Sequence, residues 1–171
     1  MKKRLLIAGA GSHARRVYNA ALASGMEVLC FFDENTANSA PVYGIEVRHS
    51  VEGLNQELFI AAVGDGAVRK RLYGKFTGLG WQAATVIHPG SHVCAEARIG
   101  AGSVLLAGSV VELDAHIGVS CIIDIGALVG HDSTVGDFCH LKPGSIVEPY
   151  SSVADFSVTG PGEVVRKTEL P

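Results

Sequence analysis

Two histidines in the second half of the chain lie where acid–base chemistry is possible. His131 is followed directly by Asp132, and His140 comes a little further along. A neutral imidazole accepts a proton near neutral pH, and a neighbouring carboxylate can hold its tautomer and stabilise its charged form. On its own, such a histidine is as readily a solvent-exposed residue, and Asp132 could simply hydrogen-bond its own backbone. The choice depends on the elements around the pair.

A six-residue period runs through this half of the chain. Every sixth residue from Ile87 to Val165 is aliphatic except Thr159, and the residue four positions later is small except at Glu163. Neither the helical period of 3.6 nor the strand period of 2 fits this pattern. It is typical of hexapeptide repeats, which predict a parallel β-helix with triangular coils of about eighteen residues. The aliphatic side chains should point into the prism and stack from coil to coil at ~4.8 Å.

The repeat also gives roles to residues that might be taken for functional ones. Gly100, Gly118 and Gly136 recur at one corner, where we expect the backbone to need conformational freedom. Cys121 and Cys139 occupy the small-residue position, so we expect them to stack inside the prism as reduced thiols. The four cysteines form no CxxC pair, and no metal site is predicted.

The first half of the chain alternates strands and helices. A strand from Leu5 to Ala8 leads through a glycine turn into a helix that ends near Gly25, and a second strand ends at Asp33. A third strand, LFIAAV, leads through another glycine turn into a second helix. This order predicts a parallel sheet covered by helices. We therefore expect an α/β, Rossmann-like domain over residues 1–86 and an all-β hexapeptide β-helix over residues 87–171.

The first glycine turn is a candidate phosphate site. GAGSHA, with Gly9 and Gly11, matches the strand–GxGxxA–helix pattern, and Asp33 ends the next strand. The glycines let a phosphate approach the backbone, and the helix N-terminus offers free N–H groups. The alternative is a tight turn without a ligand. Because the domain is short and lacks a second nucleotide half, a nucleotide-sugar fits better than a dehydrogenase cofactor.

The second glycine turn, Gly64-Asp65-Gly66, also follows a strand. Arg69 and Lys70 come next on the helix and could reach a phosphate. A solvated basic helix face explains the two residues equally well.

Composition excludes several classes of protein. The chain has 171 residues and a net charge of −3, which disfavours nucleic acid as the main partner. No apolar run approaches ~20 residues, so no membrane span is expected. The short LLIAGA run is too brief for a signal peptide, and we expect a cytoplasmic protein.

The chain resembles, along nearly its whole length, the bacterial sugar acetyltransferases that include nucleotide-amino-sugar N-acetyltransferases and sialic-acid O-acetyltransferases. The resemblance is carried by GAGSHAR, CFFDE, AAVGDGAVRK, VIHPGS and GHDSTVGDFCHLKPGS. It implies a left-handed β-helix that binds acetyl-CoA and an N-terminal half that binds a nucleotide-sugar. It also implies a homotrimer with the active site between neighbouring β-helices, and glycan or polysaccharide synthesis as the role.

The resemblance assigns roles residue by residue. His131 matches the general base, Asp132 the acid that orients it, His140 a second active-site histidine, and His13 a glycine-turn histidine that reaches the sugar. The positions that match nucleotide-sugar-binding parts of the family are Gly9, Gly11, Asp33, Gly64, Asp65 and Arg69. Those that match coenzyme-A-binding parts are Gly144, Gly160 and Gly162. The nucleophile belongs to the substrate, so neither a catalytic serine nor a metal is required.

The chain departs from the family in three ways. Asp124 stands where the family usually has asparagine. Pro149 stands where the family has a glycine whose N–H faces the thioester carbonyl, and proline has no N–H. The β-helix is about one coil shorter before GPGEVV, near the part that holds coenzyme A. Two alternatives therefore stay open: a homologue that binds a sugar nucleotide without acetyl transfer, and a transferase with another acyl donor. The sequence names neither the sugar nor the acceptor atom, nitrogen or oxygen.

Overall fold

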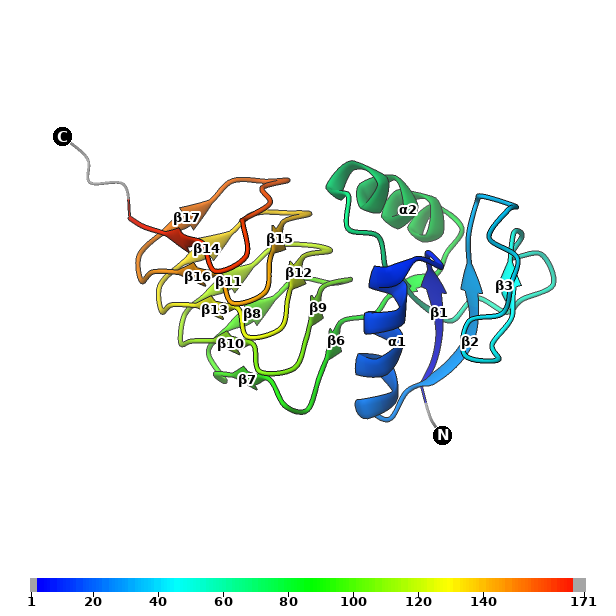
Figure 1. The fold of residues 1–171 in the computed structure, drawn as a ribbon, viewed down its shortest axis with the longest axis horizontal. Coiled ribbons are helices and arrows are strands. Elements are labelled where there is room, and N and C mark those ends of the chain that lie inside the picture. The colour runs from blue at the N-terminus through cyan, green and yellow to red at the C-terminus, as the bar shows by residue number, and fades with distance from the viewer. Residues whose placement is uncertain (1–2, 168–171) are drawn as a thin grey trace.

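The first part of the molecule is a parallel sheet between two helices (Figure 1). The computed structural model describes residues 3–167. The sheet has the order β3-β2-β1-β4-β5, and its strands are β1 (Arg4–Ala8), β2 (Glu27–Phe32), β3 (Val47–Arg48), β4 (Leu58–Ala61) and β5 (Gln82–Ala83). The helices are α1 (Ser12–Ala23) and α2 (Gly66–Gly78), as the glycine turns predicted. The short β3 was not predicted, because two residues carry no periodicity.

Alternation along the strands divides the core between the helices. Leu5 and Ile7 of β1 pack in one cluster with Val17 of α1, whereas Leu6 packs in another with Phe76 of α2. Successive side chains of a strand point to opposite faces, so a strand with both faces covered is continuously apolar. RLLIA has this composition.

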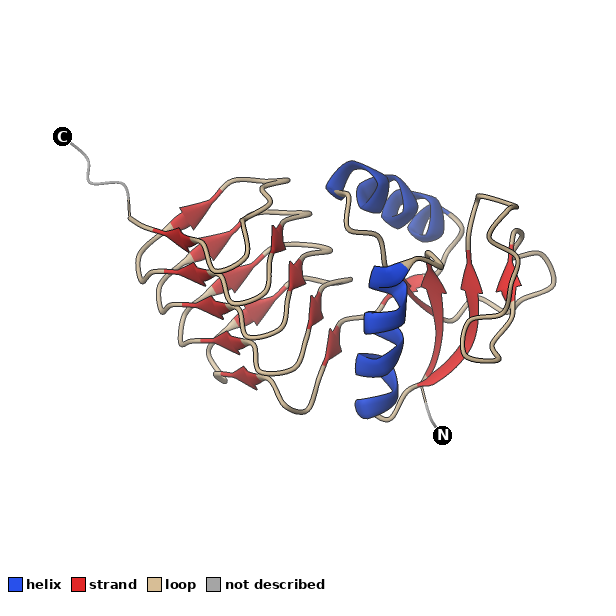
Figure 2. Ribbon diagram, in the orientation of Figure 1, coloured by secondary structure: helices blue, strands red, loops and turns tan. Residues whose placement is uncertain are grey.

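The second part is a left-handed β-helix of three stacked parallel sheets (Figure 2). The six-residue period predicted the parallel β-helix, and the resemblance predicted its left-handed sense. Face 1 contains β6 (Val86–Ile87), β9 (Val104–Leu105), β12 (Ile122–Ile123) and β15 (His140–Leu141). Face 2 contains β7 (His92–Val93), β10 (Val110–Val111), β13 (Leu128–Val129), β16 (Ile146–Val147) and β18 (Val164–Val165). Face 3 contains β8 (Arg98–Ile99), β11 (His116–Ile117), β14 (Thr134–Val135) and β17 (Ser152–Val153).

The interior of the prism follows the repeat. Val111 pairs with Val129 one coil away, and both are fully buried in one cluster. Cys121 and Cys139 are free, buried and part of the same cluster. Their predicted role as filling of the prism is confirmed.

The glycines at one corner have a different cause from the predicted one. Gly100, Gly118 and Gly136 do not have positive φ angles; a Cβ on Gly118 would lie 2.5 Å from the Asp137 carboxylate and 2.6 Å from the Gly136 carbonyl carbon. Close approach between coils therefore requires glycine there, and backbone freedom does not. The left-handed φ angles at this corner belong to Ser120 and Phe138 instead.

Face 1 joins the two parts of the molecule. Val104 and Ile122 of face 1 pack in one cluster with Val17 and Ala21 of α1. Helix α1 thus lies between the Rossmann-like sheet and the β-helix (Figure 1). At one end of face 1 the corner contacts the second glycine turn, where a Cβ on Gly66 would lie 2.9 Å from the Phe138 carbonyl oxygen. At the other end Asp124 contacts Arg16 of α1.

We predict that Gly118→Ala destabilises the protein by about 1–3 kcal/mol, because the added methyl group must displace the neighbouring coil. Gly74→Ala, in the exposed interior of α2, is the matched control; nothing lies within 4 Å of its Cβ, and it should be neutral or stabilising by about 0.5–1 kcal/mol. Urea unfolding measures both. Equal effects of the two substitutions would refute the close-approach explanation.

Candidate active site

A cleft of about 450 Å³ opens at the carboxyl ends of β1, β2 and β4. Gly9, Gly11 and His13 line it after β1, Asp33 after β2, and Gly64 after β4. In parallel α/β sheets the ligand crevice lies at this edge, where neighbouring strands connect in opposite directions. Gly9 has a φ of 127°, and a Cβ there would lie 2.8 Å from the Ala62 carbonyl oxygen, so the turn requires glycine.

The Asp33 carboxylate organises the rim of this cleft. It accepts hydrogen bonds from the backbone N–H of Ala10 at 3.2 Å and of Asn35 at 2.9 Å, and from Asn38 Nδ2 at 3.0 Å. These bonds tie the first glycine turn to the loop after β2. Asp33 therefore lines the predicted cleft while both its oxygens already have protein partners.

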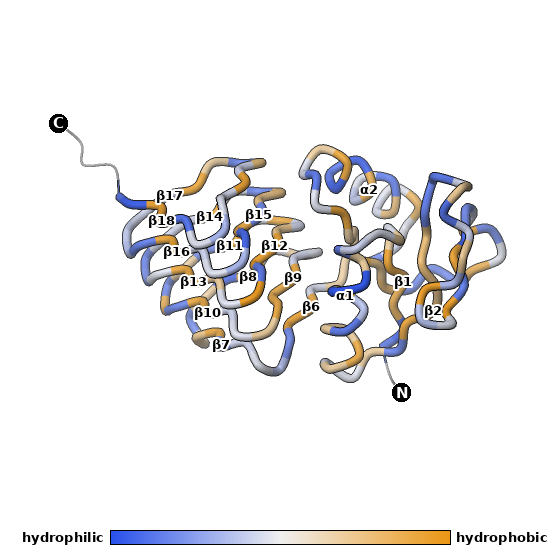
Figure 3. Tube along the Cα trace, in the orientation of Figure 1, coloured by the Kyte–Doolittle hydropathy of each residue, from blue (hydrophilic) through white to orange (hydrophobic). Residues whose placement is uncertain are grey.

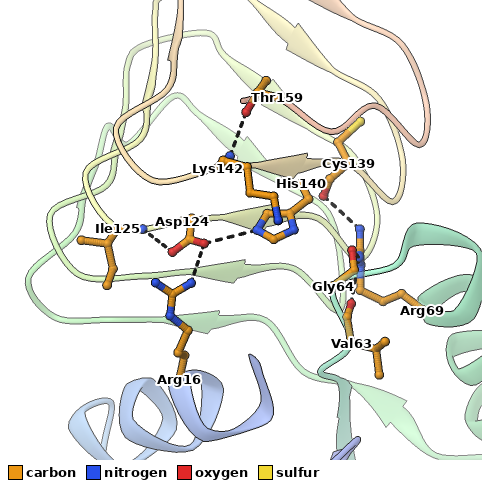
Figure 4. Close-up of polar contacts among 10 residues, drawn as sticks. All are labelled: Arg16, Val63, Gly64, Arg69, Asp124, Ile125, Cys139, His140, Lys142 and Thr159. Carbon is orange, nitrogen blue, oxygen red and sulfur yellow. Dashed lines mark hydrogen bonds and ion pairs between the residues drawn. The ribbon is translucent and has the colours of Figure 1, made fainter. Parts of the chain in front are cut away.

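A second cleft, of about 460 Å³, lies between α1 and the β-helix. The lining includes His13, Arg16, Asp124, His140 and Lys142. Figure 4 shows the last four of these side chains. Asp124 Oδ2 accepts from Arg16 NH1 at 2.7 Å and lies 3.2 Å from His140 Nε2, and Asp124 Oδ1 accepts from the Ile125 N–H at 2.7 Å. The Asp124 side chain is fully buried, whereas that of Arg16 is 40% exposed.

The electrostatics of this cleft follow from these partners. Burial acts to raise the pKa of Asp124, but the hydrogen bonds from His140 and the Ile125 amide, together with the charge of Arg16, hold the pKa below its ordinary value. Burial, with the nearby His140, lowers the pKa of His13 to about 3. Asp124 is therefore charged and His13 neutral near pH 7.

Two imidazole nitrogens in the cleft are without a hydrogen-bond partner among residues 3–167. They are His13 Nε2 and His140 Nδ1, both buried atoms of rings whose centroids are 5.8 Å apart. Buried polar atoms normally have partners. These two nitrogens are thus available to a ligand, which supports the predicted placement of both histidines at a substrate site.

Arg69 does not have the role that the sequence predicted. The side chain is only 1% exposed, and its guanidinium donates to five backbone carbonyls. The acceptors belong to Val63, Gly64, Ser120, Phe138 and Cys139. All five N–H donors are used, so the expected contact with a nucleotide phosphate is wrong.

The neighbours of Arg69 on and before α2 are easier to interpret. Asp65 caps the helix, because its Oδ1 accepts from the Val68 N–H at 2.9 Å. This gives Asp65 a structural role, and it does not line either cleft. Lys70 is exposed, with Nζ 5.3 Å from the centroid of the Phe156 ring, in keeping with a solvated basic face.

His131 and Asp132 lie elsewhere, at the corner between β13 and β14. His131 Nδ1 is 2.8 Å from Asp132 Oδ2, and the His131 N–H donates to Glu112 Oε2 at 2.9 Å. Asp132 has a φ of 56°, in the left-handed slot that this corner requires. The Tyr150 ring stands edge-on to His131 at 5.0 Å. Because this corner joins faces 2 and 3, it lies away from face 1 and from the two clefts.

The glycines matched to coenzyme A lie at the corner between face 1 and face 2. Gly144 and Gly162 have φ angles of 68° and 67°, which the corner turn itself requires, and Gly160 accompanies them.

Among residues 3–167 no group of three or more histidine, cysteine or acidic side chains is placed to hold a metal ion. No helix in the same range is long and apolar enough to cross a membrane.

Arg16 is the residue of this site that the sequence did not reveal. It is separated from Asp124 by 108 positions, and its place on α1 is that of an ordinary surface arginine. Asp124 itself stood out only as a departure from the family. No local signal could have paired the two.

The chain is similar to known proteins over most of its length. The PglD N-terminal domain model matches residues 4–76. Comparison with curated proteins gives no match. Among solved structures, a mutant of perosamine N-acetyltransferase from Caulobacter crescentus, in complex with CoA and GDP-perosamine, is 26% identical with a TM-score of 0.87, covering 95% of this chain and 88% of that chain.

A second relative extends this result. The acetyltransferase domain of PglB from Neisseria gonorrhoeae FA1090 is 25% identical with a TM-score of 0.85, covering 98% of this chain and 94% of that chain. The same domain has been solved in complex with acetyl coenzyme A. By its fold and these matches the chain is an acyltransferase of the left-handed β-helix class. Within that class it has the architecture of the bacterial sugar acetyltransferases.

We predict that Arg69→Lys destabilises the protein by about 3 kcal/mol or more, because a lysine has at most three donors and leaves buried carbonyls unpaired. Lys70→Gln, at the adjacent exposed position, is the control and should change stability by less than about 0.5 kcal/mol. Chemical denaturation followed by circular dichroism reports both values. A loss below about 1 kcal/mol for Arg69→Lys would contradict the structural role.

Proposed function

We propose that this protein transfers an acetyl group from acetyl-CoA to an amino or hydroxyl group of a nucleotide-linked sugar, in the cytoplasm and for glycan or polysaccharide synthesis. The N-terminal part, residues 1–86, would hold the nucleotide-sugar, and the β-helix, residues 87–171, the acyl donor. The paired His131 and Asp132 carry the proposal, since they form the orientation that a general base needs. The relatives that bind CoA or acetyl coenzyme A support the choice of donor.

His131 would take the proton from the attacking amino or hydroxyl group. Its Nδ1 faces the Asp132 carboxylate, so the proton of the neutral ring sits on Nδ1 and the lone pair of Nε2 is left for the substrate. The new bond to the acetyl carbon forms as the thioester C–S bond breaks, and the proton held on Nε2 can pass to the leaving thiolate. Asp132 stabilises the imidazolium in between.

The separation of His131 from the two clefts favours a site completed by a second copy of the chain. The outer residues of face 2 form a hydrophobic ladder, defined by Val110, Leu128, Ile146 and Val164. Ile146 is 36% exposed, and the hydrophobic colour recurs at these strands in Figure 3. The ladder ends at the corner of His131, so a copy that covers it would bring its own residues to the base. This supports the homotrimer that the resemblance implies.

Pro149 favours a second candidate function, in which another acyl donor is used or no acyl group is transferred. A Cβ on Gly130 would lie 2.7 Å from Pro149 N and 2.8 Å from Pro149 Cδ, so the proline ring packs directly on the residue before His131. The residue can donate no backbone hydrogen bond to a thioester carbonyl. Calorimetry with acetyl-CoA distinguishes the candidates, because only the acetyltransferase must bind it.

We predict that His131→Ala lowers the transfer rate by about 100- to 10,000-fold. The assay is a screen of nucleotide amino sugars with acetyl-CoA, with the product identified by mass. His116→Ala, an exposed histidine on face 3, is the matched control and should keep full activity. Thiol release at the wild-type rate by His131→Ala would refute the role of His131 as the base.

We predict that Ile146→Glu lowers the oligomeric mass in light scattering, because it places a charge on the hydrophobic ladder. Thr134→Glu, an exposed substitution on face 3, should leave the mass unchanged. A wild-type protein that is monomeric at all concentrations would refute the completed-site hypothesis, as would an unchanged oligomer with Ile146→Glu.

A further inference from the structure

The second cleft contains an ion pair and two imidazole nitrogens without a hydrogen-bond partner in the described part of the chain, and the proposed function uses neither feature. Asp124 is fully buried between Arg16 of α1 and His140 of β15. One side of the His140 ring therefore faces a charge, and the other side faces Gly64, where a Cβ would lie 3.9 Å from Nδ1. The two ring nitrogens of His140 have different surroundings.

The carboxylate determines which nitrogen carries the proton. Asp124 accepts hydrogen bonds and cannot donate while it is charged. Since His140 Nε2 is 3.2 Å from Asp124 Oδ2, the neutral ring is stabilised with its proton on Nε2. The lone pair then sits on Nδ1, which is buried and has no partner among residues 3–167. Such an atom loses the hydrogen bond it would make to water unless a ligand supplies a donor.

Arg16 fixes the carboxylate that contacts His140. A buried carboxylate is costly unless a positive charge and hydrogen bonds compensate for its lost hydration. Arg16 NH1, at 2.7 Å from Asp124 Oδ2, supplies the compensating positive charge. The other groups around His140 are the neutral His13 of α1, the buried Arg69 of α2 with all its donors used, and Lys142 beyond β15. Asp124 is therefore the charged group among these neighbours that can accept a hydrogen bond from the His140 ring.

We propose that Arg16 and Asp124 are positioning residues that hold His140 with Nδ1 as a hydrogen-bond acceptor, and that Nδ1 receives an N–H or O–H of the acceptor sugar in the second cleft. The ligand half of this inference rests on the proposed function; the tautomer half does not. The cleft thereby selects a sugar that places a donor group between His13 and His140.

The tautomer is measured on the free protein by nitrogen NMR with ¹⁵N-labelled histidine, and His140→Gln identifies the signals. We expect the ring proton on Nε2 and a free lone pair on Nδ1. Asp124→Asn, which keeps the shape and removes the charge, should abolish the preference for Nε2–H. A proton on Nδ1 of the wild-type ring, or an unchanged tautomer in Asp124→Asn, would overturn the proposal.

The role of Arg16 has its own test. In Arg16→Met the carboxylate loses the contact that fixes it against His140 Nε2, so the preference for the Nε2–H tautomer should weaken, whereas Arg16→Lys should retain it. Arg15→Met, on the same helix and exposed, is the matched control. Thermal unfolding confirms that each variant is folded. If Arg16→Met retains the tautomer preference as Arg15→Met does, the positioning role of Arg16 is wrong.

The ligand half is tested with GDP-perosamine as the probe. Titration into the labelled protein should shift the Nδ1 signal of His140, and Asp124→Asn should weaken that effect at least several-fold. No shift at saturating concentration would overturn the ligand half. The tautomer result on the free protein stands apart from this outcome, and from any failure of the acetyl-transfer assay.

Discussion

A buried guanidinium holds the two parts of the molecule in a fixed relation. Arg69 donates to carbonyls after β4 and to carbonyls at two stacked corners of the β-helix. A charged group can be removed from water only when its donors are satisfied, and here every acceptor is a rigid backbone atom. Since Gly64 and His140 flank these contacts, the width of the second cleft depends on them. Loss of Arg69 would therefore alter both stability and the site.

The β-helix limits where chemistry can be placed. Inward positions are taken by aliphatic and small side chains, and one corner needs glycine because neighbouring coils come within contact distance. Polar groups are left to the outer strand positions and to the other corners. His140 is an outward residue of face 1, and His131 is a corner residue. The repeat thus separates His131, the proposed base, from the second cleft by the thickness of the prism, and the proposed neighbouring copy would bring the two together.

The two histidine–carboxylate pairs differ in a useful way. His131 meets Asp132 through Nδ1 at a partly exposed corner, whereas His140 meets Asp124 through Nε2 in a buried cleft. The first pair leaves Nε2 free, which suits proton transfer with a mobile substrate. The second pair leaves Nδ1 free in a confined space, which suits a hydrogen bond to a donor group of a bound ligand. Environment, more than residue type, is therefore what distinguishes the roles proposed for the two histidines.

The sequence by itself determined the β-helix, the α/β sheet with its two helices, and the adjacency of His131 to Asp132. Periodicity and short-range order encode these features, because each depends on residues within one coil or one turn. Only the tertiary structure decided that Arg69 is buried and that Arg16 reaches Asp124, since these contacts join residues 51 to 108 positions apart. It also decided that Gly118 is needed for space, because the neighbouring coil is invisible to local conformational rules. Charge pairing across domains leaves no periodic trace, so it appears only once the chain has folded.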